Sequence, residues 1–144
     1  MKLCTASETL SFIREELEEK AAKFYEELAK RFPEKEETFL TFAKENRKYN
    51  KQIQMAYQSV ITDAIEGCYA FDLEADHYTF ETDLPESASL SEAAAKALAI
   101  EGKILDCYTV GAEQSASLLA DVPRNFKIVL RKRNNRLEKL KSLA

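Results

Sequence analysis

Two glutamates, each followed seven residues later by a tyrosine, are the side chains whose type and spacing most strongly suggest chemistry. Glu18 precedes Tyr25 and Glu101 precedes Tyr108, and both pairs lie in segments with helical spacing of apolar residues. Glu101 interrupts an apolar stripe, with spacings of three and four, that is formed by Ala94, Leu98, Ile104, Leu105 and Tyr108. A carboxylate there points inward, where an unpaired charge is very costly. A metal ion or a basic side chain must therefore compensate it.

The other reactive side chains give weaker signals. Three cysteines, odd in number and widely spaced, lack a C-x-x-C pair: Cys4, Cys68 and Cys107. This spacing argues against a zinc knot, a rubredoxin-type iron centre or a disulfide scaffold, and we expect buried free thiols. The one histidine, His77, stands beside Asp76 and is interpreted as a solvated loop residue. The sequence contains no Gly-rich phosphate loop and no Ser–His–Asp arrangement.

Positive charge is concentrated near the end of the chain. The formal net charge is −4, but residues 121–144 contain eight Lys or Arg against two acidic residues, which gives +6 there and −10 elsewhere. Such a segment can attract nucleic acid or an acidic partner. Leu130, Leu137 and Leu140 mark it as a core helix, so we favour the interpretation that its charges neutralise acidic neighbours within the protein. Nucleic acid is therefore the less favoured partner.

Composition and periodicity predict an all-α protein with a single domain spanning residues 1–144. Three Gly and three Pro are too few for an ordinary all-β chain, and a charged fraction of 32% suits amphipathic helices. Thr5 with Glu8 forms a capping box before the first helix, Ser89 with Glu92 opens the third, and Pro33 separates the first two helices. The apolar spacing and these signals predict helices at about 6–32, 34–66, 89–119 and 122–142.

The segment 67–88 is predicted to be a long crossover. Its residues reach about 70 Å when extended, whereas a helix of thirty residues is only about 45 Å long. The crossover can therefore return the chain to the end at which it started. The result is two antiparallel helical hairpins joined by a long crossover, which is the plan of a ferritin-like four-helix bundle.

With this plan the sequence resembles the rubrerythrin-like branch of the ferritin-like superfamily, over nearly the whole chain and in pattern more than in identity. Members place a glutamate on the first and third helices, followed by an aromatic pair like Phe24 and Tyr25. Their second and fourth helices carry Glu-x-x-His after an aromatic and small apolar stretch like residues 39–43. The resemblance implies a carboxylate-bridged di-iron centre, which reduces peroxide in rubrerythrins and handles oxygen or iron in ferritins and their relatives.

The match to the family's six ligands is incomplete. Glu18 and Glu101 fall on the ligand positions of the first and third helices. The other four ligand positions, which include both histidines, hold different side chains: Asn46 and Tyr49 on the second helix, and Arg133 and Arg136 on the fourth.

These substitutions suggest that protein cations replace iron. Arg133 lies on the apolar stripe of its helix, and arginine bridges carboxylates while staying charged when buried. A fixed cation would also repel a divalent metal. We therefore expect a network that joins Glu18, Arg133 and Glu101, with further hydrogen bonds from Asn46 and Tyr49.

The function favoured by the sequence is that of a metal-free, non-catalytic relative of rubrerythrin, without a cofactor, that acts as a binding or structural module. Glu18 and Glu101 would then be vestigial metal ligands. The alternative is a di-iron or single-metal oxidoreductase acting on peroxide or oxygen, in which Glu45 or His77 completes an atypical ligand set.

The sequence says less about partners and location. A homodimer is compatible with this kind of bundle, and the identity of any other protein partner stays open. No apolar run approaches the roughly 18 residues that suggest a membrane span. The N-terminus lacks the apolar core of a signal peptide, so a cytoplasmic location is expected.

Overall fold

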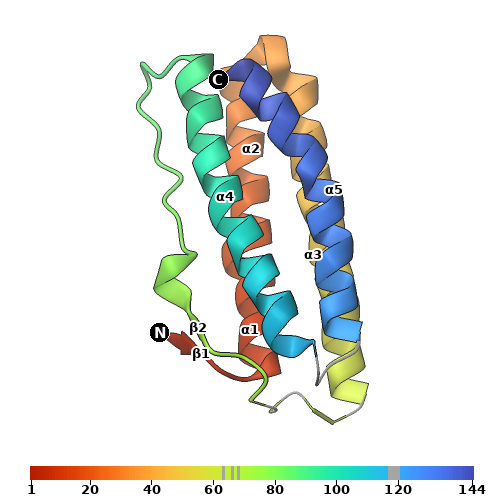
Figure 1. The fold of residues 1–144 in the computed structure, drawn as a ribbon. Coiled ribbons are helices and arrows are strands. Elements are labelled where there is room, and N and C mark those ends of the chain that lie inside the picture. The colour runs from red at the N-terminus through yellow and green to blue at the C-terminus, as the bar shows by residue number, and fades with distance from the viewer. Residues whose placement is uncertain (63, 66, 68, 117–120) are drawn as a thin grey trace.

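A computed structural model of the chain describes residues 1–144 except 63, 66, 68 and 117–120. The described residues are mostly helical, and four long helical segments pack side by side (Figure 1), which confirms the prediction of an all-α protein. The first segment comprises α1 (Ala6–Phe12), η1 (Ile13–Glu19) and α2 (Lys20–Arg31). The others are η2 (Pro33–Lys35) with α3 (Glu36–Thr62), α4 (Leu90–Ser115) and α5 (Asp121–Leu143).

The helix starts follow the sequence signals. The Thr5 hydroxyl accepts a hydrogen bond from the backbone N–H of Glu8, whose carboxylate accepts one from the backbone N–H of Thr5. Ser89 and Glu92 form the same reciprocal cap before α4. Each cap satisfies two backbone donors that the helix itself leaves unpaired.

The first helical segment contains a π-helix that the sequence did not predict. The expected helix 6–32 runs continuously to Arg31, but residues Ile13–Glu19 form the π-helical turn η1. A π-helix pairs residues five apart, so it is wider than an α-helix and changes the direction in which side chains point. Glu18 belongs to this turn.

The predicted helix 34–66 extends too far at its C-terminal end. Its start is the 3-10 turn η2, and α3 ends at Thr62. Ala64 is left-handed, with φ 57°, while the Ile65 N–H bonds the Val60 carbonyl at 2.8 Å. This is a Schellman end, and a left-handed residue cannot continue a right-handed helix. Residues 63 and 66 of the predicted second helix and 117–119 of the predicted third lie outside the described residues.

The crossover is tied to the bundle along its length. It includes a short strand, β2 (Leu73–Glu74), which pairs antiparallel with β1 (Lys2–Leu3), and the turn η3 (Ala75–His77). Further along, three basic side chains from α2 and α4 donate to crossover carbonyls: Lys20 to Phe80 at 2.5 Å, Arg31 to Leu84 at 3.1 Å and Lys103 to Thr79 at 2.8 Å. The crossover therefore lies along the bundle beside α4 (Figure 1).

The core runs along the axis between the helices. α2 packs mainly on α3, and α4 mainly on α5, while α3 and α5 join the two hairpins. Aromatic rings line the interior, including Tyr25, Phe39 and Phe42 near one end and Tyr108 with Phe126 further along. Among the described residues, no helix combines the length and the apolar character needed to cross a membrane.

Candidate functional site

Six buried side chains from all four helical segments meet in an ion cluster inside the bundle. They are Glu18 from η1, Asn46 and Tyr49 from α3, Glu101 from α4, and Arg133 and Arg136 from α5. The two glutamates and Arg133 have 0% of their surface exposed, and Arg136 has 2%. The resemblance to rubrerythrins aligned these six positions with metal-ligand positions, and the structure brings all six together.

Both carboxylate oxygens of Glu18 are occupied by protein donors. Oε1 accepts a hydrogen bond from Asn46 Nδ2 at 2.8 Å and is paired with Arg133 Nη2. Oε2 accepts from the hydroxyl of Tyr108 at 2.5 Å.

Glu101 is held in a similar way. Its Oε2 accepts from Arg133 Nη1 at 2.6 Å. Its Oε1 accepts from Arg136 Nη1 at 3.1 Å and from the Tyr25 hydroxyl at 3.2 Å. Arg133 therefore bridges the two carboxylates, and the expected network of Glu18, Arg133 and Glu101 is present.

Arg136 extends the cluster toward α3. Sequence reasoning had placed only Arg133 on the inward stripe, yet Arg136 is buried as well. Its Nη1 donates to Asn46 Oδ1 at 2.9 Å, and its Nη2 donates to the Phe42 carbonyl at 3.0 Å and to Glu45 at 3.1 Å. Glu45 lies at the edge of the cluster, with 35% of its side chain exposed. The signal that could have placed Arg136 inward is its spacing of three residues from Arg133 on one helix face.

Tyr49 contributes its ring rather than the hydrogen bond that the sequence suggested. The ring centroid lies 4.8 Å from Arg133 Cζ and 5.5 Å from Arg136 Cζ. Both guanidinium groups therefore lie over the electron-rich face of the ring, which attracts their positive charge. The Nε atoms of the two arginines have no hydrogen-bond partner among the described residues.

The two tyrosines that follow the glutamates exchange partners between the hairpins. Tyr25 follows Glu18 in sequence but donates to Glu101, and Tyr108 follows Glu101 but donates to Glu18. Both hydroxyls are buried, as expected for core aromatic residues with hydrogen-bonded hydroxyls. Each hairpin thus supplies a hydrogen-bond donor to the carboxylate of the other.

The buried charges balance. Two glutamates face two arginines inside the cluster, with Glu45 at its margin. Burial alone raises the pKa of Glu101, but the guanidinium groups of Arg133 and Arg136 outweigh it and hold that pKa below its usual value. For Glu18, burial dominates over Arg133 and raises the pKa of the carboxyl. The cluster is therefore stabilised as a set of mutually neutralising charges rather than as one strong pair.

Burial also keeps the neighbouring tyrosine hydroxyls and the Cys107 thiol protonated. Desolvation, with the charge of Glu18, raises the pKa of Tyr108, and desolvation with the charge of Glu101 raises that of Tyr25. Both tyrosines therefore remain protonated donors at neutral pH. Burial and Glu18 likewise raise the pKa of the Cys107 thiol to about 12, so this buried free cysteine is a poor nucleophile.

The remaining candidate residues take no part in a metal-binding arrangement in the described part of the chain. Glu45 is engaged by Arg136, and His77 is an exposed residue of η3, as expected for a solvated histidine. Cys4 is a half-buried free thiol, while Cys68 lies outside the described residues. No group of three or more His, Cys, Asp or Glu among the described residues is placed to hold a metal.

The donor set of the cluster does not fit a di-iron centre. Each carboxylate oxygen of Glu18 and Glu101 already accepts at least one hydrogen bond from a protein donor. Iron sites of this kind use imidazoles and several free carboxylates, whereas here the guanidinium of Arg133 bridges the glutamates and that of Arg136 pairs with Glu101. The arrangement can keep paired charged side chains buried and can fix the positions of the helices that carry them.

Comparison of the chain with protein-family models, curated proteins and solved structures found no significant match.

Proposed function

We propose that this protein is a metal-free, non-catalytic relative of the rubrerythrins, with a ferritin-like bundle in which a buried ion cluster stands where relatives hold iron. In this proposal the bundle serves as a binding or structural module. The observation that carries it is the bridging of Glu18 and Glu101 by Arg133, with hydroxyl, amide and guanidinium donors on all four carboxylate oxygens.

The energetics of the cluster support a structural role. Removing one member of a buried, mutually paired set leaves an uncompensated charge, which is far more costly than losing an exposed ion pair. A metal that displaced Arg133 would have to replace its contacts to both carboxylates and move its side chain out of a closed interior. The cluster therefore favours the metal-free state.

The first test is the metal content of the protein after anaerobic incubation with ferrous iron and removal of unbound metal. We expect iron far below one equivalent per chain in a folded sample. Near-stoichiometric iron would overturn the proposal and would favour the oxidoreductase alternative.

A second test restores the ligands that the resemblance implies. The variant Asn46→Glu, Tyr49→His, Arg133→Glu and Arg136→His should bind iron or cobalt, because the six side chains already converge. A matched control places the same residue types with the same spacing on exposed positions of the same helices: Lys48→Glu, Lys51→His, Lys132→Glu and Asn135→His. A well-folded restored variant that binds no more metal than this control would show that the relationship to rubrerythrins is wrong.

A further inference from the structure

The buried cluster uses only part of the positive charge of α5. Arg133 and Arg136 neutralise buried carboxylates, while Arg124 pairs with Asp121 at 2.8 Å. In the part of the chain that the structure describes, no acidic group lies within ion-pair distance of four other exposed cations of α5: Lys127, Arg131, Lys132 and Lys139. Neutralisation within the bundle therefore accounts for the buried arginines but not for these exposed side chains.

Helix α3 adds further cations beside them. Glu45, Gln52 and Ser59 all form hydrogen bonds with α5, so the flank of α3 that carries them faces that helix. Lys48, three residues after Glu45 and four before Gln52, lies on the same flank and is exposed.

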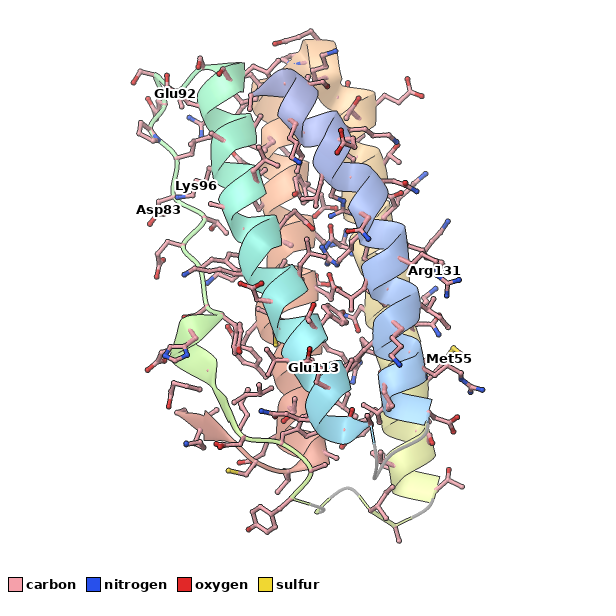
Figure 2. The ribbon with its side chains drawn as sticks, viewed as in Figure 1. Met55, Asp83, Glu92, Lys96, Glu113 and Arg131 are labelled. Carbon is pink, nitrogen blue, oxygen red and sulfur yellow. The ribbon has the colours of Figure 1, made fainter. Side chains whose placement is uncertain are left out.

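We define the basic face as the exposed residues Lys48, Lys51, Arg124, Arg131 and Lys132. Figure 2 shows Arg131 of α5 and Met55 of α3 projecting outward on one side of the bundle, while Asp83 and Glu92 lie on the other side.

Few acidic residues lie beside this face: Asp121 pairs with Arg124, and Glu45 pairs with Arg136. Residues 46–62 of α3 and 122–137 of α5 contain no Asp or Glu. Residues 69–116, which include the crossover and α4, contain ten acidic residues against two lysines, a net charge of −8. Acidic residues are thus concentrated on the side of the crossover and α4. On the basic face, Arg124 pairs with Asp121, while the other four cations have no ion-pair partner among the described residues.

We propose that the basic face binds the phosphate backbone of double-stranded nucleic acid without reading its sequence. Phosphate contacts are made chiefly by Arg, Lys, Asn and Gln, and the face combines its five cations with the exposed Asn134 and Asn135 of α5. Protein–protein interfaces are enriched in arginine and methionine, but they are depleted of lysine and have a core that is more apolar than the rest of the surface. Met55 is the large exposed apolar side chain next to the face, with 61% of its surface exposed. Release of condensed counterions provides binding free energy without apolar burial.

The geometry favours a duplex over a single strand. Residues 127–144, which include most of α5, contain no aromatic residue on which an unpaired base could stack, as in single-strand binding. From Arg124 to Lys132 the helix rises about 12 Å, which corresponds to three or four base-pair steps measured along the duplex axis, where each strand carries one phosphate per about 3.4 Å. The lysines of α3 lie beside this row and reach the same backbone or the neighbouring strand.

The test measures binding of the full chain to a fluorescent 20-base-pair DNA duplex of arbitrary sequence by anisotropy, at salt concentrations from about 30 to 300 mM. For five phosphate contacts we expect log K to fall with log salt with a slope of about −4 to −5. The variant Arg131→Ala should reduce this slope by about 1. The charge reversals Lys48→Glu with Lys51→Glu, and Arg131→Glu with Lys132→Glu, should each weaken binding at least about tenfold.

The control reverses two exposed lysines of α2, Lys23→Glu with Lys30→Glu, and changes the net charge by the same amount. At about 100 mM salt its affinity should stay within about twofold of the wild type, since charges more than about 10 Å away are then largely screened. Equal weakening by control and basic-face variants would overturn the proposal, as would absence of duplex binding at 30 mM salt. Binding to an acidic polypeptide, or self-association at low salt, without duplex binding would also overturn it and would identify a protein partner.

Discussion

Neighbouring cations of α5 have opposite environments. Arg133 is fully buried and bridges two glutamates, while Arg131 and Lys132, two residues and one residue earlier, are exposed and have no ion-pair partner among the described residues. The same residue type therefore does different work on the two faces of one helix. The inward arginines hold the hairpins together, and the outward ones are available to a partner.

This difference shows that the charge of a segment does not by itself reveal its role. In a buried set, each charge is compensated by named neighbours, and the set is stable only as a whole. On the surface, water and salt compensate each charge, so its removal costs the fold little. The predictions below test this contrast, beginning with the largest expected effect.

Arg133→Met should lower the free energy of unfolding by about 3–5 kcal/mol, because it leaves Glu18 and Glu101 buried without their bridging cation. Arg131→Met is the matched control, and its stability should stay within about 0.5 kcal/mol of the wild type. Urea denaturation followed by circular dichroism measures both. Equal effects of the two substitutions would show that the cluster does not stabilise the fold.

Glu101→Gln should cost about 3 kcal/mol at pH 7, because it removes the charge that faces Arg133 and Arg136. The folded protein lowers the pKa of Glu101, so this contribution is fully present above the ordinary value near 4.3 and is lost as pH falls through the folded-state pKa. The stability difference between wild type and variant should therefore shrink below about pH 4. Urea midpoints from pH 7 to pH 3 measure it, and Glu138→Gln on the exposed end of α5 should show no such difference.

Tyr108→Phe should destabilise the protein by about 1–3 kcal/mol, because Tyr108 is the donor on Glu18 Oε2. Tyr25→Phe should cost less, about 1 kcal/mol, because Glu101 Oε1 keeps Arg136 as a donor. Each variant lacks one hydroxyl group of the wild type, so their unfolding midpoints can be compared directly. A larger loss for Tyr25→Phe would contradict the assignment of donors.

The two glycines of α4 give a similar contrast between a position packed against a neighbouring helix and a position with free space. A Cβ on Gly111 would lie 2.6 Å from the Phe126 ring, so Gly111→Ala should destabilise by about 1–3 kcal/mol. A Cβ on Gly102 would meet nothing within 4 Å, so Gly102→Ala should stabilise the helix by about 0.5–1 kcal/mol. Thermal melting distinguishes the expected loss of stability from the expected gain. A stabilised Gly111→Ala variant would mean that α4 and α5 pack less closely than described.

Much of the fold and of the cluster follows from local sequence signals. Apolar spacing gave the helices, and the capping pairs of Thr5 and Ser89 marked two starts correctly. These inferences depend on residues a few positions apart, where helix geometry fixes the outcome. The expectation that Asn46 and Arg133 meet Glu18 and Glu101 came instead from the resemblance to the rubrerythrin ligand pattern.

The features that were missed depend on contacts between distant residues. The pairing of Lys2–Leu3 with Leu73–Glu74 has no local signature, because the strands are two residues long and about 70 residues apart. The π-helix Ile13–Glu19 differs from an α-helix in its backbone hydrogen bonds, and the residue types of this segment do not signal that difference. Tyr49 could be placed inward, but whether its hydroxyl or its ring would meet the arginines depends on where two other helices dock.

The bridging of the two hairpins by Arg133 also governs when the chain can complete its fold during synthesis. Arg133 lies 115 residues after Glu18 and 32 after Glu101, so the first hairpin leaves the ribosome with its inward carboxylate unmatched. Contacts between residues so far apart slow folding, since a long loop must close before they form. Glu18 therefore lacks its cationic partner until α5 has been synthesised, and the ion cluster can form only after that helix is available.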